Sequence, residues 1–306
     1  MSRLGSDAVF RFNVDLWRDY SIDIDACGFT LANPAGRTVT EETLAKVYWR
    51  KPQVSADLYP EKSFSKEEQY FQGEIWYALR ELVNLQWALG KVVLVEPGAE
   101  SRVGKLVQLR ASEGLFETPA WRFARGVQFP ATAGAVSVAK SFTLGRVGAA
   151  KALYATKVDA SKLDAAAPWF VTEYVPAILD VTVVFVRGAL FAFEFPRALF
   201  LDKAIDWRLV ALEEDVNWRP HEMQGEFGDK IRQLMGRLTL DYGRLDFLLT
   251  DSGKYVFLEV NPNGEWGWLD KAGAHGVLNR ILDEVSPDTS PHPLPAALRP
   301  ISAFSL

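Results

Sequence analysis

Two β-prone runs near the C-terminus, GRLDFLLT and KYVFLEV, flank the polar turn sequence at residues 251–253. Two such runs around a short turn predict a β-hairpin, which commits this part of the chain to an antiparallel sheet. If Ser252 and Gly253 form a two-residue turn, counting back along both strands places Asp246 directly opposite Glu259. The hairpin therefore brings two carboxylates from different strands side by side.

The second strand of this hairpin has one apolar and one polar face. Side chains alternate between the faces of a strand, so Leu258 and Val260 are expected on the core side, and Glu259 and Asn261 on the other. Pro262 cannot donate a hydrogen bond to a sheet, so the strand is expected to end there. The polar face therefore ends where the strand stops, at a position that is open to a ligand.

Two carboxylates in this position need a neutralising charge. Directly opposed residues have Cβ atoms about 4.5–5.5 Å apart, and like charges at that separation destabilise a sheet. Magnesium takes oxygen ligands and shares them with substrate phosphates. Either carboxylate alone would more often be a solvated surface residue, but their shared register favours a metal site. We therefore predict that Asp246, Glu259 and Asn261 hold Mg²⁺.

Composition limits the remaining possibilities. A chain of 306 residues that is 48% hydrophobic can bury a large core and form two or three domains or subdomains. Its net charge of -5 argues against a nucleic-acid partner. The single cysteine, Cys27, excludes an internal disulfide, and no signal peptide or membrane-spanning apolar run is present. We expect a cytoplasmic protein with no membrane partner.

The first hundred residues combine β-prone and helical patterns. A turn at residues 33–36 predicts a hairpin, and apolar residues recur at helical spacing from Ser65 to Leu89. Short strands are expected at 46–49 and in the segment VVLVEPG, and a further helix at 102–112.

The rest of the chain is richer in β-prone runs. Helical periodicity returns at 220–240 and 269–285, and a Pro-rich tail starts at Ser286. Arg187-Gly188 is a candidate two-residue hairpin turn. Strands are expected at 135–140, 150–158, 169–175, 180–186 and 189–195.

The sequence RLDFLLTDSGKYVFLEVNPNGEW resembles the metal-binding hairpin of ATP-grasp ligases, and NPNGEWGWL is similar to the microviridin-type branch, the graspetide ligases that mature ribosomal peptides (RiPPs). The segments YWRKP, VGKLVQLRASEGLFETPAW, VAKSF, FVTEYVP and IDWR follow in the family's order, from about residue 8 to about residue 285. The resemblance implies an α/β (α+β) ATP-grasp fold. It predicts an apparently shortened pre-ATP-grasp domain (1–100), a central helix and lid (101–172), a C-terminal antiparallel-sheet subdomain with the metal site (173–285), and the tail (286–306).

The resemblance also implies ATP and Mg²⁺ as cofactors and assigns roles to single residues. Lys105 and Lys140 would approach the phosphates, and Arg208, oriented by Asp206, would hold them. Without the resemblance, the lysines could be surface charges and Asp206–Arg208 a surface ion pair. The predicted catalytic residues are Lys140 and Arg208, and the predicted nucleotide-binding residues are Lys105, Lys140, Glu173, Val175, Asp180 and Arg208, with Glu173 and Val175 beside the adenine.

One position departs from the family pattern. After the adenine hinge the family has an acidic residue, an apolar residue and an arginine, whereas this chain has Asp180, Val181 and Thr182. We expect that Arg208, Arg197 or Arg187 compensates for the missing arginine, or that turnover is weak.

The function implied by the resemblance is ATP-dependent ligation. Asp or Glu side chains of a precursor peptide would be activated as acylphosphates and joined to a hydroxyl or amine, which forms ester or amide cross-links. The expected partner is that precursor peptide, engaged also through its leader, and the family suggests a homodimer. Two alternatives remain open: a ligase that joins an amino acid or small amine to a peptide or small acid, and a nucleotide-binding regulator with weakened catalysis.

Overall fold

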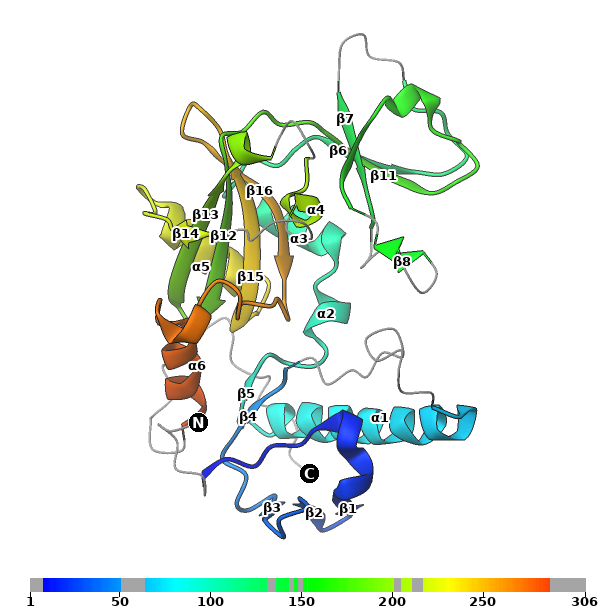
Figure 1. Cartoon of the computed structure of the whole chain (residues 1–306), viewed down its shortest axis with the longest axis vertical. Coiled ribbons are helices and arrows are strands. Elements are labelled where there is room, and N and C mark those ends of the chain that lie inside the picture. The colour runs from blue at the N-terminus through cyan, green and yellow to red at the C-terminus, as the bar shows by residue number, and fades with distance from the viewer. Residues whose placement is uncertain are drawn as a thin grey trace.

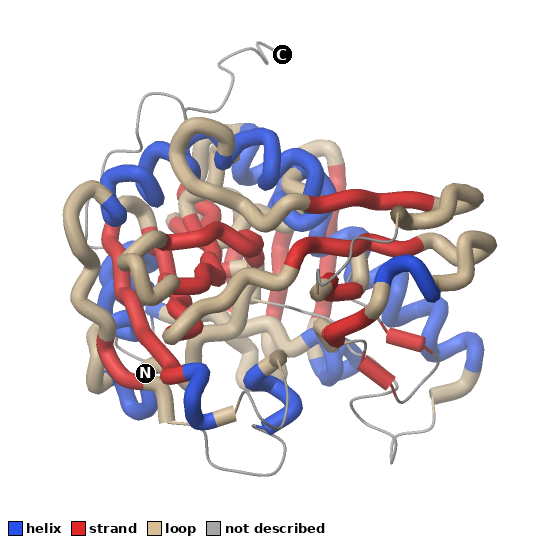
Figure 2. The backbone as a smooth tube through the Cα atoms, turned by 90° about the horizontal axis from the view of Figure 1, so that it is seen from above, coloured by secondary structure: helices blue, strands red, loops and turns tan. Residues whose placement is uncertain are grey.

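The computed structural model describes residues 8–50, 64–130, 136–142, 146–147, 151–152, 154–200, 205–210 and 217–286. Three regions are visible in Figure 1: an N-terminal region at the bottom, a central sheet above it, and a small lid sheet at the upper right. Seen from above in Figure 2, strands occupy the middle of the molecule and helices lie along its margins. The predicted mixture of helices and antiparallel sheets is confirmed.

The central sheet has five antiparallel strands in the order β14-β13-β12-β15-β16. Its β12–β13 hairpin turns at Arg187 and Gly188, whose φ angles of 43° and 88° are those of a tight two-residue turn, as predicted. The strands are β12 (Leu179–Val186), β13 (Ala189–Pro196), β14 (Arg219–Pro220), β15 (Tyr242–Leu249) and β16 (Tyr255–Asn261).

Both faces of this sheet are covered by helices. Val181 and Val183 of β12 belong to a buried cluster with α5 (Phe227–Arg237), and α3 (Lys105–Ser112) packs on the same side. Val184 and Val186 face the other way and belong to a cluster with α6 (Val277–Val285). Burial on two sides explains the almost continuous apolar run of β12. Asp180 and Thr182 therefore share the face of Val184 and Val186 by strand alternation.

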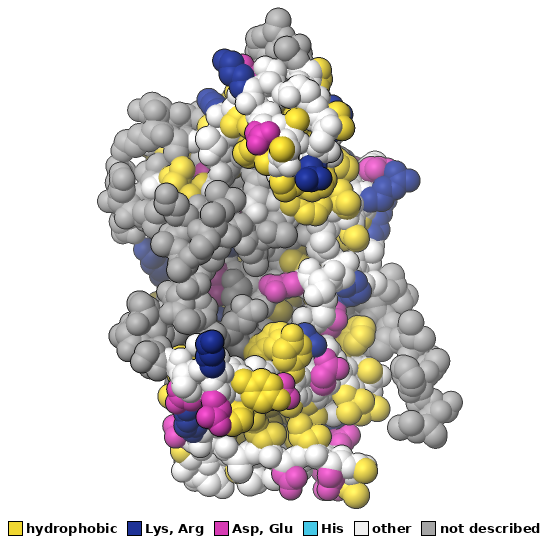
Figure 3. All heavy atoms as spheres, turned by 90° about the vertical axis from the view of Figure 1, so that its right-hand side faces the viewer, with side chains coloured by type: hydrophobic (Ala, Val, Ile, Leu, Met, Phe, Trp, Pro, Cys, Tyr) yellow, Lys and Arg dark blue, Asp and Glu magenta, His cyan; other side chains and the backbone are white. Residues whose placement is uncertain are grey.

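The lid is a separate four-stranded antiparallel sheet in the order β10-β7-β11-β6. On the face shown in Figure 3, the surface recedes between this lid above and the N-terminal region below. The lid strands are β6 (Trp121–Ala124), β7 (Ser137–Lys140), β10 (Thr156–Val158) and β11 (Trp169–Glu173), with a small pair β8 (Arg146–Val147) and β9 (Lys151–Ala152) beside them. Short helical turns are η3 (Ala160–Lys162), η4 (Arg197–Leu199) and α4 (Trp207–Val210).

The N-terminal region packs a long helix, α1 (Lys66–Ala88), on strands and on η2 (Val14–Asp19). Ser65 caps this helix: its hydroxyl accepts from the Glu68 backbone, and the Glu68 carboxylate accepts from the Ser65 backbone. The strands are the antiparallel β1 (Ser21–Asp25), β2 (Gly28–Ala32) and β3 (Thr38–Thr40), and the parallel pair β4 (Lys46–Tyr48) and β5 (Val92–Leu94).

Three predicted helices are shorter or broken. The helix expected at 102–112 is divided at Val103-Gly104 into α2 (Ala99–Arg102) and α3. The helix expected at 220–240 begins only at Phe227, because Pro220 pairs with Phe193 in the sheet.

The helix expected at 269–285 begins only at Val277. Gly273 and Gly276 have φ angles of 75° and 88°, which interrupt any helix, and η5 (Lys271–Gly273) is all that precedes α6.

Strand β6 was not predicted at all, and the predicted Pro-rich tail lies outside the described residues apart from Ser286. None of the described helices combines the length and apolar character needed to cross a bilayer.

Candidate nucleotide and metal site

A cavity of about 460 Å³ lies between the lid sheet and the polar face of the central sheet. Its walls come from α3, from β7 and β11 of the lid, from β12, β15 and β16 of the central sheet, and from residues 205–208. The structure brings every predicted site residue to this one cavity: Lys105, Lys140, Glu173, Val175, Asp180, Arg208, Asp246, Glu259 and Asn261. Residues separated by more than 150 positions in the sequence thus share one pocket.

The predicted pairing of Asp246 with Glu259 is confirmed, although the turn and the strand pairing that lead to it differ from the prediction. Asp246 pairs with Glu259, but Leu249 pairs with Tyr255, so the turn is longer than the predicted two residues. A β-bulge restores the register, because Phe247 pairs with Phe257 and leaves Leu258 without a partner. The expectation that Leu258 faces the core is wrong: the bulge turns it toward the pocket, which it lines beside Glu259.

The pocket is organised by ion pairs. Each of its four central carboxylates has a cationic partner: Glu259 with Lys105 at 2.8 Å, Asp246 with Arg244 at 3.2 Å, Asp180 with Arg197 at 3.0 Å, and Asp206 with Arg208 at 2.8 Å. Lys140 is different, since it forms no ion pair within the described part of the chain and lies 5.8 Å from the centre of the Phe170 ring. It is therefore the cation of the pocket that is available for an incoming anion.

Glu259 is held in its charged form. Burial by itself raises the pKa of Glu259, but the charges of Lys105, Lys140 and Arg208 outweigh that effect and lower it to about 2. Burial lowers the pKa of Lys140, although Glu259 partly offsets this. The two groups thus lie in one electrostatic network, with a carboxylate that is ionised at neutral pH.

Asp180 has the opposite tendency. Burial raises its pKa to about 7 despite the charge of Arg197, and the nearby Asp246 and Asp206 add to the increase. Arg197 donates to both carboxylate oxygens of Asp180 at 3.0 Å and to the backbone carbonyl of Ile205 at 3.3 Å. Asp180 is thus the acidic group of the pocket whose charge changes near neutral pH.

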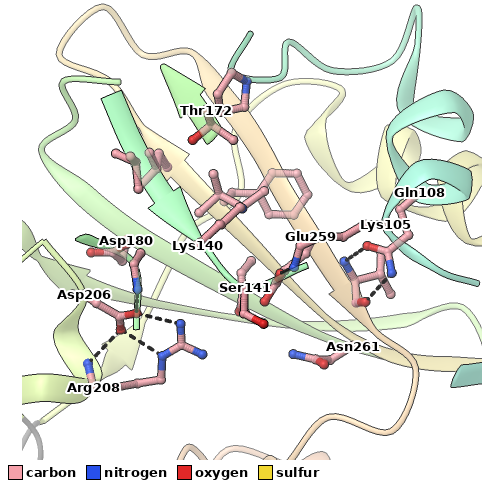
Figure 4. A pocket seen from close by; sticks show the side chains of 18 of the residues that line it. Lys105, Gln108, Lys140, Ser141, Thr172, Asp180, Asp206, Arg208, Glu259 and Asn261 are labelled. Atoms are coloured by element: carbon pink, nitrogen blue, oxygen red, sulfur yellow. Dashed lines mark hydrogen bonds and ion pairs between the residues drawn. The ribbon is translucent and has the colours of Figure 1, made fainter. Parts of the chain in front are cut away.

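The predicted Asp206–Arg208 pair is present and is not a simple surface pair. Arg208 donates to Asp206 through both Nε and Nη2 at 2.8 Å, and Asp206 is buried. Figure 4 shows this pair on one side of the pocket and Lys105, Gln108 and Glu259 on the other. The carboxylate fixes the guanidinium at the pocket wall, where it can meet an anion.

Of the three arginines expected to compensate for Thr182, Arg187 lies too far from the pocket to do so. It lies in the turn at the far end of β12 from Asp180, where it forms ion pairs with Asp241 and Glu284. Arg197 and Arg208 both line the pocket.

Arg244 is the pocket residue that sequence reasoning missed. It lies two residues before Asp246 on β15, hence on the same face, and donates to Asp246 at 3.2 Å. Thr182, opposite Asp246 in the sheet, donates its hydroxyl to the same carboxylate at 2.8 Å. The i, i+2 spacing of Arg244 and Asp246 in a predicted strand was the feature that could have identified it.

The oxygen donors of Asp246, Glu259 and Asn261 are the type that Mg²⁺ prefers. Within the described residues no group of three or more His, Cys, Asp or Glu side chains is arranged to hold a metal. Two carboxylates and an amide would supply only part of an octahedral shell, which leaves positions for phosphate oxygens and water. The residues therefore fit a magnesium ion that arrives with a nucleotide.

The strand end beside these ligands folds back tightly. A Cβ atom on Gly264 would lie 2.5 Å from Cβ of Arg244 and 3.1 Å from Cβ of Asn261. Only glycine fits there, so Gly264 allows the chain to turn directly after the polar face of β16.

Solved ATP-grasp ligases share this fold. A RiPP-associated ATP-grasp ligase of Chryseobacterium gregarium, in complex with ADP and a leader and core peptide, is 21% identical with a TM-score of 0.76, over 93% of this chain and 90% of that chain. The macrocyclase MdnC of Microcystis aeruginosa, bound with precursor peptide MdnA, is 19% identical with a TM-score of 0.70, over 89% and 88% of the two chains. PsnB, complexed with a phosphomimetic variant of its minimal precursor, Mg and ADP, is 16% identical with a TM-score of 0.64, over 87% and 85%.

The predicted ATP-grasp fold is confirmed by these similarities, which extend over nearly the whole chain. No protein-family model and no curated protein matches the sequence. The predicted domain boundaries and the roles of the individual site residues stay predictions.

Proposed function

We propose that this protein is an ATP- and Mg²⁺-dependent ligase that activates Asp or Glu side chains of a ribosomal precursor peptide and joins them to hydroxyls or amines. The observation that carries the proposal is the pairing of Asp246 with Glu259 inside a cavity that also contains Lys105 and Lys140. The peptide substrate is supported by the peptide complexes of the Chryseobacterium ligase and of MdnC, and the cofactors by the ADP and Mg in the structures with this fold.

The charges of the pocket suit a nucleotide triphosphate. Glu173 and Val175 line the cavity at the connection between lid and central sheet, where they would face the adenine. Lys105, Lys140 and Arg208 would then neutralise the phosphates, and Mg²⁺ held by Asp246, Glu259 and Asn261 would supply further positive charge. Phosphoryl transfer depends mainly on positioning and charge, so these residues need not act as covalent catalysts.

The proposed reaction has two steps. A substrate carboxylate oxygen attacks the γ-phosphorus and ADP leaves, which produces an acylphosphate. A hydroxyl or amine of the peptide then attacks the acyl carbon, and phosphate and one proton are released.

The test is ADP release in the presence of synthetic peptides that contain Asp or Glu together with Thr, Ser or Lys. Wild-type protein should release ADP with such peptides, and Asp246→Asn should reduce turnover at least 100-fold. Asp251→Asn, an exposed change in the turn of the same hairpin, is the matched control and should retain full activity. Equal turnover in the Asp246 and Asp251 variants would remove the metal role from Asp246.

Thr182 in place of an arginine is the sequence feature that favours the alternative of a nucleotide-binding regulator. Arg244 supplies a cation beside Asp246, so the positive charge that Thr182 lacks is present in the pocket. ATP-dependent thermal stabilisation without ADP release across the peptide panel would favour the regulator. A homodimer, as expected from the family, stays a prediction.

A further inference from the structure

The lid sheet carries two large aromatic side chains that lie outside the nucleotide cavity. Trp121 and Phe123 of β6 are 42% and 49% exposed, although aromatic side chains of this size are mostly buried. Neither residue lines the cavity. β6 is the last strand of the lid, and among the described residues no strand pairs with its outer side. Exposed aromatic residues on an open sheet edge favour association with another chain, so we expect this surface to have a partner.

The register of the lid sheet places these two residues on the face that points to the cavity. Phe123 pairs with Phe170, and Phe170 pairs with Lys140. Directly paired residues point to the same face of a sheet, so Phe123 shares a face with Lys140, which lines the cavity. Trp121 pairs with Thr172, another cavity residue, and therefore lies on that face as well. The aromatic surface thus continues the inner face of the lid sideways, beyond the wall of the cavity.

Ring contacts make this surface continuous with the cavity. Phe142, at the cavity wall, has its ring centre 5.1 Å from that of Phe123 and 5.4 Å from that of Phe170. The ring centre of Trp121 lies 6.0 Å from that of Phe170. Phe170 is buried and forms the base on which the other rings pack. We call Trp121, Phe123, Phe142 and Phe170 the aromatic shelf.

The aromatic shelf adjoins a cation without a counterion. Lys140 forms no ion pair within the described part of the chain, and its ammonium lies 5.8 Å from the centre of the Phe170 ring. A ligand that covers the shelf and also reaches this end of the cavity therefore needs an apolar group and an anionic group at a fixed separation. A peptide with a large apolar residue near an Asp or Glu has both groups, and its charge is complementary to that of Lys140.

The spacing of strands gives the separation of the two groups. Lys140 and Phe123 lie on β7 and β6, with β11 between them, so their backbones are about 10 Å apart. An extended peptide advances about 3.3 Å per residue, which puts its apolar residue about three residues from the acidic one. Flexible side chains widen this range to about two to four residues.

We propose that the aromatic shelf binds an aromatic or large aliphatic side chain of the precursor peptide, close in sequence to the Asp or Glu that is activated. The inference rests on the proposed function and adds a determinant of peptide sequence, since the shelf would select which acidic residue enters the cavity. Trp121 and Phe123 are specificity residues in this role, because they contact the peptide away from the reacting atoms.

The experiment measures peptide binding to the full chain saturated with Mg·ADP, by saturation-transfer NMR titration. The first probe, acetyl-Phe-Ala-Ala-Glu-Ala-Ala-Phe-amide, carries an aromatic residue on either side of the acid. The second has alanine in place of both phenylalanines, and the third has glutamine in place of the glutamate. The first probe should bind at least tenfold more tightly than either of the others. Equal binding of the first and third probes would show an aromatic site unconnected with the carboxylate and would overturn the proposal.

Substitutions on the shelf should remove the preference for the aromatic probe. Phe123→Ser should reduce the ratio of the first two affinities to about twofold or less, whereas Phe123→Leu should keep part of it. Trp121→Ser is the second variant and should act in the same direction. Tyr77→Ser is the matched control, because Tyr77 is an aromatic residue of α1 that is 52% exposed, and it should keep the full ratio. An unchanged ratio in both serine variants of the shelf would refute the inference.

Two further measurements identify other occupants of the shelf. Phe123→Ser should keep its ADP affinity within twofold; a larger loss would assign the shelf to the nucleotide. Sedimentation velocity should give the same oligomeric state for wild type and Phe123→Ser, and a dimer present only in the wild type would assign the shelf to a second copy of the chain. Either result, or no binding of the first probe to the wild type, would overturn the inference, whereas failure to bind Mg·ADP would refute the proposed function.

Discussion

Thr182 and Asp246 are direct partners in the central sheet, and the threonine hydroxyl donates to the carboxylate at 2.8 Å. Arg244 approaches the other oxygen of the same carboxylate at 3.2 Å. The departure from the family pattern at position 182 is thus accompanied by a cation at position 244. The site has a guanidinium beside Asp246 that comes from β15 and not from β12.

Thr182→Arg should lower activity at least tenfold. Thr182 is 1% exposed, so a larger cationic side chain would have to displace neighbours and would lie against Arg244. Overpacking of this kind costs about 1–3 kcal/mol. Steady-state ADP release and urea unfolding measure both effects.

The reciprocal variant, Thr182→Arg with Arg244→Thr, should recover part of the lost activity because only one guanidinium remains beside Asp246. A rate increase in Thr182→Arg alone would show that the missing arginine limits turnover and would contradict this interpretation.

Lys140→Met should weaken ADP binding about tenfold without lowering stability. Lys140 has no ion pair among the described residues, so its removal leaves no charge without a partner, and methionine retains much of the side-chain volume. Isothermal titration calorimetry gives the ADP dissociation constant. Lys157→Met, an exposed lysine on β10, is the control; equal ADP affinities in the two variants would place Lys140 outside the phosphate site.

Glu259→Gln should have opposite effects on ADP binding with and without Mg²⁺. In the structure Glu259 holds Lys105 at 2.8 Å. Its neutralisation should release Lys105 for phosphate, which increases ADP affinity in the presence of EDTA. The same change removes a metal ligand, so the gain in affinity that Mg²⁺ gives the wild type should disappear. A decrease of ADP affinity under both conditions would argue against this exchange of partners.

The pH dependence of stability should differ between wild type and Asp180→Asn. Burial raises the pKa of Asp180 from 3.8 to about 7, so between these values the folded state keeps a proton that the unfolded state has lost. Stability contributed by this group is therefore present below about pH 4 and decreases as the pH rises to 7, by up to about 1.4 kcal/mol per pH unit.

Urea unfolding of the nucleotide-free protein at pH 4.5, 6 and 7.5 tests this predicted loss of stability with rising pH. Asp180→Asn removes the titrating group, so its stability relative to wild type should increase steadily with pH, even if its absolute value is lower because Arg197 loses its partner. Parallel curves for the two proteins would show that the pKa of Asp180 is not raised.

Local patterns predicted elements whose causes are local. The long helix that begins after Ser65 and the tight turn at Arg187-Gly188 were predicted because neighbouring residues carry the periodic apolar pattern of a helix and the residue types of a two-residue turn. The helices predicted at 220–240 and 269–285 were too long because the same apolar periodicity continues into Pro220, which joins the sheet, and into residues before Gly276. Apolar periodicity alone does not show that Pro220 pairs in the sheet or that the residues before Gly276 are not helical.

The sequence by itself determined that Asp246 and Glu259 lie on the two strands of one hairpin, because two β-prone runs flank a short polar turn. Only the tertiary structure decided how that register is reached, through a longer turn and the bulge at Leu258, and which cations face the carboxylates. Lys105 comes from α3, and no local rule links Glu259 to this counterion, whereas Arg244 lies on the same strand as Asp246, two residues away. A pair such as Lys105–Glu259 forms only when separate elements pack, since the charge of a buried group is balanced by the groups that the fold places beside it.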